Sequence, residues 1–164
     1  MDENEELKTL LKMTAVFRDF DDSTLDIIAP CVSTVAFDVD EYIIRDGQAA
    51  DLFYVVHKGT VMIEMALPPS RCVWLYTLVE TDVIGGSWLA PPYRWNFDAR
   101  AVSQVEAIEF DARRLRTLCE QNHDLGLMMS RRFMSVMESR LTAVHLQLLN
   151  MYVPRSATNV FQEA

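Results

Sequence analysis

One short segment of the sequence combines residue types that bind an anion. Gly85-Gly86-Ser87 offers unshielded backbone N–H groups and one hydroxyl, and Arg94 follows shortly after. Phosphate is bound by backbone N–H groups at the start of a helix together with a guanidinium. The segment therefore predicts a small-anion site with Arg94 as its charged group.

Catalytic and metal-binding patterns are not legible elsewhere. No nucleophile–histidine pair and no Walker-type glycine loop is found. The three cysteines form no CxxC pair, and Cys72 as a lone haem ligand has no confirming partner. The three histidines are solitary: His57, His123 and His145. We expect a protein that is not an enzyme and that carries no metal or cofactor.

Short runs of β-branched and aromatic residues, from about residue 31 to 110, predict the framework of this site. Turn-forming residues separate the runs every 10–12 residues, which is typical of a barrel or jelly roll. Lys58-Gly59 fits a tight hairpin turn with a positive φ. The predicted strands are Val32–Val39, Tyr42–Arg45, Phe53–His57, Val61–Leu67, Val73–Val79 and Val105–Phe110.

Helical spacing of apolar residues flanks the predicted strands. Residues 5–17 predict a first helix, and Ser23 predicts the N-cap of a short second helix that stops near Pro30. The region 111–152 predicts two further helices. Asp111 is expected to cap Arg113–Gln121, and Asp124 to cap a long helix that Pro154 ends.

The long helix carries two apolar stripes. A helix of 28 residues spans roughly 42 Å, and a small roll cannot cover both of its sides. A second copy of the helix would cover the other stripe, so a homodimer is expected. The alternative is that both stripes pack on the roll. The residues expected to contact a partner are Met137, Leu141, Val144, Leu148 and Met151.

These elements predict an α+β fold that is mainly β. We expect an antiparallel jelly-roll-type β-roll with N-terminal helices and a long C-terminal helix. The expected domain covers residues 1–152, with the roll at about 31–110, the C-terminal helices at about 111–152 and a flexible tail at 153–164.

Charge and termini limit the partners. The net charge is −9, and residues 1–64 hold 14 acidic and 5 basic side chains, which disfavours DNA. Arginine supplies every basic residue from 65 to 164. The acidic N-terminus is unlike a signal peptide, and no membrane span is legible. We expect a cytoplasmic protein with reduced cysteines that binds neither DNA nor membrane.

The segment from Ile43 to Val61 resembles the first signature of cyclic-nucleotide-binding domains. It reads IIRDGQAADLFYVVHKGTV, in which two aliphatic residues, a turn glycine, an acidic residue, a Tyr-centred strand and a second turn glycine match that signature. The likeness covers roughly residues 15–150 and includes the flanking helices, as in the catabolite activator protein and the regulatory subunit of cyclic-AMP-dependent kinase. It implies a single-domain, bacterial-type member that lacks the DNA-binding domain.

The second family signature, the phosphate-binding cassette, is only partly matched. Gly85 matches the family glycine, but Gly86 stands where the family has the glutamate that binds the ribose 2′-OH. Trp95 falls on the phosphate-binding arginine, with Arg94 one residue away. The residues that the resemblance assigns to the ligand are Gly85, Gly86, Ser87, Trp88, Leu89, Arg94, Trp95 and Asn96.

The resemblance implies a stand-alone regulatory domain that signals through its C-terminal helix. Its candidate ligands are cyclic AMP, cyclic GMP or a related small anion, with Trp88 or Trp95 stacked on a base. The alternative is a dimeric scaffold or protein-interaction subunit that binds no ligand. In that case the aromatic residues fill the pocket, and Arg94 pairs with Asp98 or lies in solvent.

Overall fold

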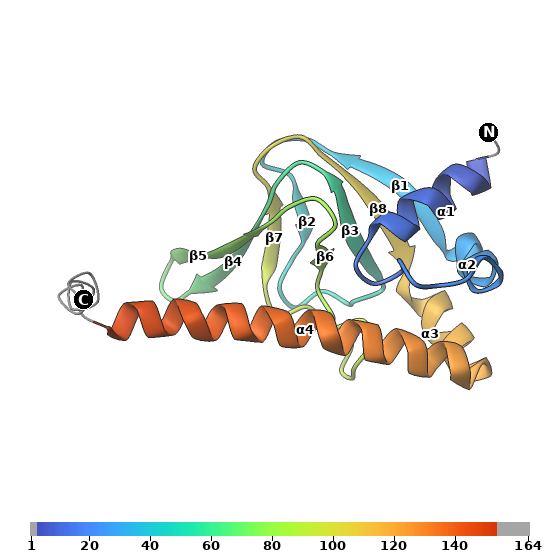
Figure 1. Cartoon of the computed structure of the whole chain (residues 1–164). Helices are drawn as coiled ribbons and strands as arrows, with labels where there is room; N and C mark the ends of the chain where they lie inside the picture. Colours follow the sequence, from blue (N-terminus) through green and yellow to red (C-terminus); the bar gives the residue numbers. More distant parts are fainter. Residues whose placement is uncertain (1–2, 154–164) are drawn as a thin grey trace, which may run out of the picture.

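The structure, a computed structural model, describes residues 3–153 of the chain. Two antiparallel sheets form its β-roll (Figure 1). The strands are β1 (Val32–Phe37), β2 (Tyr42–Ile44), β3 (Leu52–Lys58), β4 (Val61–Leu67), β5 (Arg71–Leu78), β6 (Val83–Ile84), β7 (Asp98–Ala101) and β8 (Val105–Asp111). One sheet has the order β1-β8-β3-β6 and the other β2-β7-β4-β5. The predicted fold class is confirmed.

Two of these strands are absent from the sequence prediction. β6 has only two residues, and β7 reads Asp-Ala-Arg-Ala, without a β-branched or aromatic residue. Pairing holds both in place, because β6 lies against β3, and β7 lies between β2 and β4. Tertiary pairing thus overrides weak local propensity.

The turn at Lys58-Gly59 has the predicted backbone but a different role. Gly59 has φ +95°, and a Cβ atom there would lie 2.2 Å from the carbonyl oxygen of Gln104, so only glycine fits. However, β3 and β4 belong to different sheets. The predicted hairpin is therefore wrong, and this turn carries the chain from one sheet to the other.

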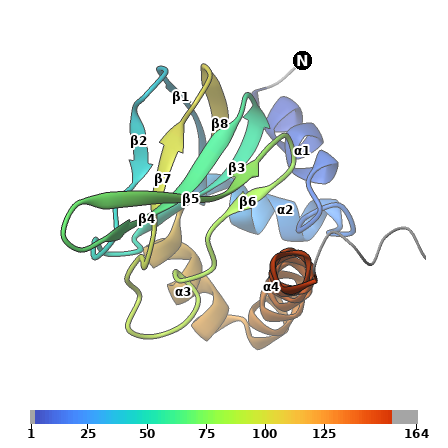
Figure 2. The same cartoon turned by 90° about the vertical axis from the view of Figure 1, so that its left-hand side faces the viewer.

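The helices cover one end and one side of the roll (Figures 1 and 2). They are α1 (Glu3–Met13), α2 (Asp22–Ile28) with a 3-10 turn at Ala29–Cys31, α3 (Ala112–Gln121) and α4 (His123–Tyr152). The first helix ends at Met13 rather than at residue 17, although Phe17 is buried in the core as a loop residue. Within residues 3–153, no helix has the length and apolar character needed to cross a membrane.

Side-chain caps fix where three of the helices begin. Asp111 caps α3, as predicted, by accepting a hydrogen bond from the backbone N–H of Arg114 at 3.0 Å. For α2 and α4 the predicted cap lies two residues beyond the observed one. Asp21, not Ser23, caps α2, and Asn122, not Asp124, caps α4. In each case the earlier side chain has the oxygen that reaches the third residue beyond it.

The two stripes of α4 have different surroundings. Leu125, Met129 and Phe133 are buried in the core, where Phe133 meets Phe53 of β3. Along the second stripe Leu141 is 54%, Leu148 45% and Met151 80% exposed. The expectation that the roll cannot cover both stripes is confirmed. The predicted tail beyond Val153 lies outside the described residues.

A column of aromatic rings joins the roll to the helices. Phe17, Phe110, Phe53 and Trp88 stack in sequence, with ring centroids 4.5–5.1 Å apart. Phe133 of α4 meets both Phe53 and Trp88 edge to face. Since Trp88 belongs to the predicted ligand segment, this column connects that segment to the core and to α4.

Candidate ligand-binding cassette

The predicted cassette is the segment 85–97, which connects β6 to β7. Turns shape it: the backbone N–H of Leu89 donates to the carbonyl of Gly86 at 3.1 Å, and that of Tyr93 donates to Ala90 at 3.0 Å. The segment contains no helix. The backbone N–H groups of Gly85-Gly86-Ser87 are therefore presented by turns rather than by the start of a helix.

Trp95 occupies the space next to the cassette glycine. Gly85 has φ +83°, and a Cβ atom there would lie 2.1 Å from the Trp95 ring. Only 4% of Trp95 is exposed. The indole ring of Trp95 thus packs directly against Gly85, in the region where the family resemblance expects a phosphate-binding arginine.

Met137 of α4 occupies the space next to the second glycine. A Cβ atom on Gly86 would lie 3.0 Å from the Met137 Sδ. The sequence predicted Gly86 as a ligand residue and Met137 as a partner-contact residue, and the fold brings these two residues together. A side chain in place of Gly86 would need Met137 to shift by a few tenths of an ångström, because its thioether already lies beside this glycine.

Trp88 has no free face for a ligand. Its ring stacks on Phe53 at 4.5 Å, meets Phe133 edge to face, and is fully buried. Its Nε1–H group has no hydrogen-bond partner among the described residues. Stacking of a base on Trp88 or on Trp95 therefore requires a rearrangement of the core.

Arg94 points away from the cassette interior. Its Nη1 donates to the carbonyl of Gly47 at 2.7 Å, and the side chain is exposed. The suggested pair with Asp98 is not formed, because Asp98 accepts from the backbone N–H of Asp46 at 2.7 Å and lies 3.5 Å from Arg45 Nε. The two alternatives for Arg94 were an ion pair with Asp98 or a side chain in solvent, and the structure shows the second.

The remaining predicted ligand residues lie around these groups. Ser87 and Leu89 are partly buried, and Asn96 is exposed. Phe97 packs beside Trp95, with ring centroids 5.9 Å apart. The segment is thus lined by aromatic and aliphatic side chains on its inner side, and its polar side chains face outward.

Sequence reasoning missed the arginine that holds the cassette in place. Arg116 of α3 donates through Nη1 to the carbonyls of Trp88 at 2.8 Å and Ala50 at 3.0 Å, and its guanidinium lies 4.4 Å from the Tyr93 ring centroid. Asp51 accepts from its Nη2 at 3.4 Å. The sequence places Arg116 on the predicted helix Arg113–Gln121. Its two carbonyl partners are 28 and 66 positions away in the sequence, so no local pattern indicates these contacts.

A buried ion pair stabilises the strand that follows the cassette. Arg100 on β7 donates to Glu64 at 2.5 Å and to Asp40 at 2.5 Å, while Cys72 donates to Glu64 at 2.6 Å. Burial raises the pKa of Glu64, but the hydrogen bonds from Cys72 and Arg100 outweigh it and lower that pKa overall. Two carboxylates thus engage the Nε and Nη1 groups of Arg100 and orient its guanidinium along the sheet.

Comparison with known proteins agrees with this architecture. The family model of the cyclic nucleotide-binding domain matches residues 34–122. A cyclic nucleotide-binding domain from Methylobacillus flagellatus has a TM-score of 0.76 at 14% identity, over 92% of this chain and 85% of that one. The sensor domain of the transcriptional regulator DNR from Pseudomonas aeruginosa gives 0.70 at 19%, over 87% and 95%.

A third similar structure is the regulatory domain of Toxoplasma gondii PKA with cAMP. Its TM-score is 0.66 at 17% identity, and the match covers 78% of this chain and 49% of that one. At such identities the solved structures establish the fold. The family model covers more than half of the chain and spans both the first signature and the cassette. This chain belongs to the cyclic nucleotide-binding domain family.

Proposed function

We propose that this chain is a regulatory domain in which α4 responds to the state of the cassette. The observation that supports it is the contact between Gly86 and Met137, because one residue belongs to the cassette and the other to α4. A change on either side of this contact changes the space available to the other. No separate relay is required between cassette and helix.

The proposed ligand is a cyclic nucleotide, cyclic AMP or cyclic GMP, or a related small anion. It would bind at the predicted cassette residues, with Ser87 and Arg94 as its donors, once Arg94 turns away from the carbonyl of Gly47. To enter, it must displace Trp95 from Gly85. Exposing a buried aromatic ring costs about 3 kcal/mol, and a ribose hydroxyl without the family carboxylate loses about 1–3 kcal/mol more. We therefore expect weak binding that competes with the closed state.

A second candidate function is a protein-interaction subunit that binds no ligand. It is favoured by the burial of both Trp88 and Trp95, which together fill the inner side of the cassette. The two candidates share an output surface. We propose that the exposed stripe of α4, with Leu141, Leu148 and Met151, contacts a second copy of this chain.

Titration with cyclic AMP and cyclic GMP separates the two candidates. Binding is measured by calorimetry, and the Met137 methyl group is followed by NMR and assigned with Met137→Leu. The sensor proposal expects weak binding, a shift of the Met137 methyl signal and a loss of affinity in Arg94→Ala. The matched control is Arg131→Ala, because Arg131 is an exposed arginine that lies on α4, outside the cassette.

The variant Trp95→Arg extends the test. It removes the ring that closes the cassette and restores the family arginine, so affinity should rise at least tenfold, provided that urea unfolding shows a cooperative fold. Absence of heat with both ligands at millimolar concentration, in wild type and variant alike, favours the ligand-free subunit. Binding that leaves the Met137 signal unchanged would contradict coupling through Gly86.

A further inference from the structure

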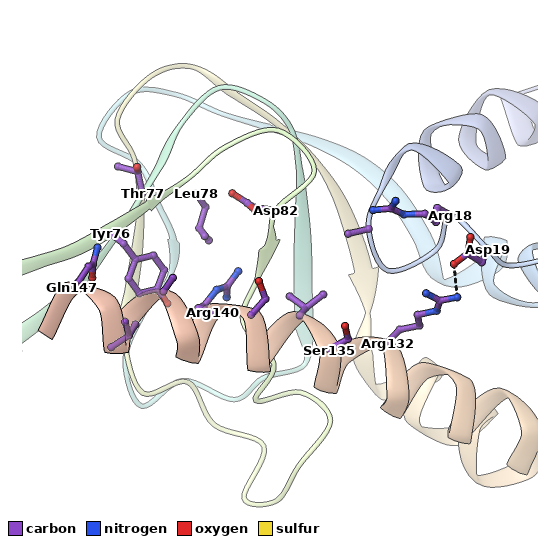
Figure 3. Close-up of a pocket in the computed structure, with 15 residues that line it drawn as sticks. Arg18, Asp19, Tyr76, Thr77, Leu78, Asp82, Arg132, Ser135, Arg140 and Gln147 are labelled. Carbon is purple, nitrogen blue, oxygen red and sulfur yellow. Dashed lines mark ion pairs between the residues drawn. The ribbon is translucent and has the colours of Figure 1, made fainter. Parts of the chain in front are cut away.

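A groove of about 660 Å³ lies between α4, β5 and the loop after α1 (Figure 3). No residue of the cassette segment 85–97 lines it. Its volume falls within the range of small-molecule sites, about 300–1,000 Å³. The buried stripe of α4 continues into this groove, at the point where the helix separates from the roll.

Three arginines line the groove. Arg132 forms an ion pair with Asp19 at one end. Arg140 stands in the middle and is held there, because its Nη2 donates to the carbonyl of Val83 at 2.8 Å and its guanidinium lies 5.7 Å from the Tyr76 ring centroid. Arg18 forms no ion pair within the described part of the chain. Figure 3 places Arg18 beside Arg132 and Asp19.

Acidic groups neutralise only part of this charge. Asp82 also lines the groove, and its Oδ2 accepts from the backbone N–H of Val79 at 2.8 Å. The lining therefore carries three guanidiniums and two carboxylates, one of which is paired with Arg132. In a chain with a net charge of −9, a local excess of positive charge in a concave site favours an anion there.

The other lining groups suit an organic molecule rather than a bare ion. Tyr76 and Leu78 of β5 form one wall, and Val136, Ala143 and Val144 of α4 form the other. Hydroxyl and amide groups are interspersed: Thr77, Ser135, Ser139 and Gln147. From Arg132 to Arg140 the helix rises about 12 Å, which exceeds the size of one phosphate group.

We propose that this groove binds an extended organic phosphate with the chemistry of a nucleoside diphosphate. The phosphates lie between Arg18 and Arg140, where guanidinium groups make bidentate contacts to phosphate oxygens. The ring lies toward Tyr76, against the apolar side chains. Because such a ligand contacts the loop after α1, β5 and α4 together, it holds the second half of α4 against the roll.

The test uses ADP, inorganic phosphate and cyclic AMP as probes, with calorimetry and backbone amide NMR. ADP should bind and shift the amides of Ser135 and Ser139, and inorganic phosphate should bind more weakly. Arg140→Gln and Arg18→Gln should each weaken ADP binding by about tenfold or more. Arg131→Gln removes the same charge from an exposed site on α4 and should leave binding unchanged.

Three results would overturn the proposal: no amide shift with ADP at millimolar concentration, ADP shifts confined to Gly85–Ser87, or equal binding in the three arginine variants. Arg18 is exposed and makes no ion pair among the described residues, so Arg18→Gln tests binding without disturbing the fold. The cassette proposal is tested separately by cyclic nucleotides and the Met137 signal, and either proposal can fail while the other stands.

Discussion

The two halves of α4 have similar apolar content and opposite surroundings. In the first half the apolar side chains of one face, Leu125, Met129 and Phe133, are buried in the core, whereas from Leu141 to Met151 most apolar side chains face solvent. Figure 1 shows α4 starting beside α3, passing along the roll, and ending near the tip of β4 and β5. Burial of its first half therefore anchors α4, and its second half is available for contacts.

The largest expected effect is at the last buried residue of the anchored half. Phe133→Ala removes the ring that contacts Phe53 and Trp88 and should lower the free energy of unfolding by about 3–5 kcal/mol. Urea denaturation measures it. Met134→Ala, the exposed neighbour, should change this free energy by less than about 0.5 kcal/mol. Similar losses in both variants would contradict the contrast between the two stripes.

A smaller effect is expected at the boundary between the halves. Met137 is partly buried against Gly86, so Met137→Ala should destabilise the fold by about 1–2 kcal/mol, less than a fully buried methionine. Hydrogen exchange of the Gly85–Ser87 amides should become faster at the same time, because the variant leaves space beside the cassette. Unchanged exchange there would show that Met137 stabilises α4 alone.

The start of the anchored half provides the third comparison. Asn122→Ala removes the side-chain oxygen that accepts from the backbone N–H of Leu125 and should cost about 1 kcal/mol in thermal or urea unfolding. Asp124→Asn, in the first turn, should cost only a few tenths of a kcal/mol through the helix dipole. A larger loss of stability in Asp124→Asn than in Asn122→Ala would instead indicate that Asp124 caps the helix.

The smallest effect on folding is expected in the exposed half. Leu148→Glu should change the unfolding free energy of the monomer by less than about 0.5 kcal/mol, yet it should convert dimers to monomers in sedimentation velocity experiments. Thr142→Glu adds the same charge at an exposed position outside the stripe and should leave the dimer intact. A wild-type protein that sediments as a monomer would refute the homodimer proposal.

Local residue patterns predict most of the roll and little of its pairing. β4 matches its predicted run, Val61–Leu67, because β-branched and apolar residues fill it. β7 could not be found, since Asp-Ala-Arg-Ala is a strand only between two neighbours. The turn at Lys58-Gly59 shows the same limit, because its φ depends on local sterics while the partner of each strand depends on the whole sheet.

The cassette was predictable in composition and not in conformation. Four aromatic residues within ten positions indicated that the pocket could be filled, but only the fold shows that Trp95 covers Gly85. The contact of Gly86 with Met137 joins positions 51 residues apart in sequence. The groove was further out of reach, since its lining residues come from three separate elements: the loop after α1, β5 and α4.

The length of α4 beyond its last buried residue has a mechanical consequence. From Phe133 to Tyr152 the helix extends about 28 Å, so in the proposed coupling it would act as a lever arm whose pivot lies beside the cassette. A tilt of about 10° at that pivot displaces the far end by about 5 Å. In the proposed coupling, a side-chain movement of ångström size at Met137 would thus become a displacement of several ångströms at the far end of α4, enough to take one interface out of register and align another.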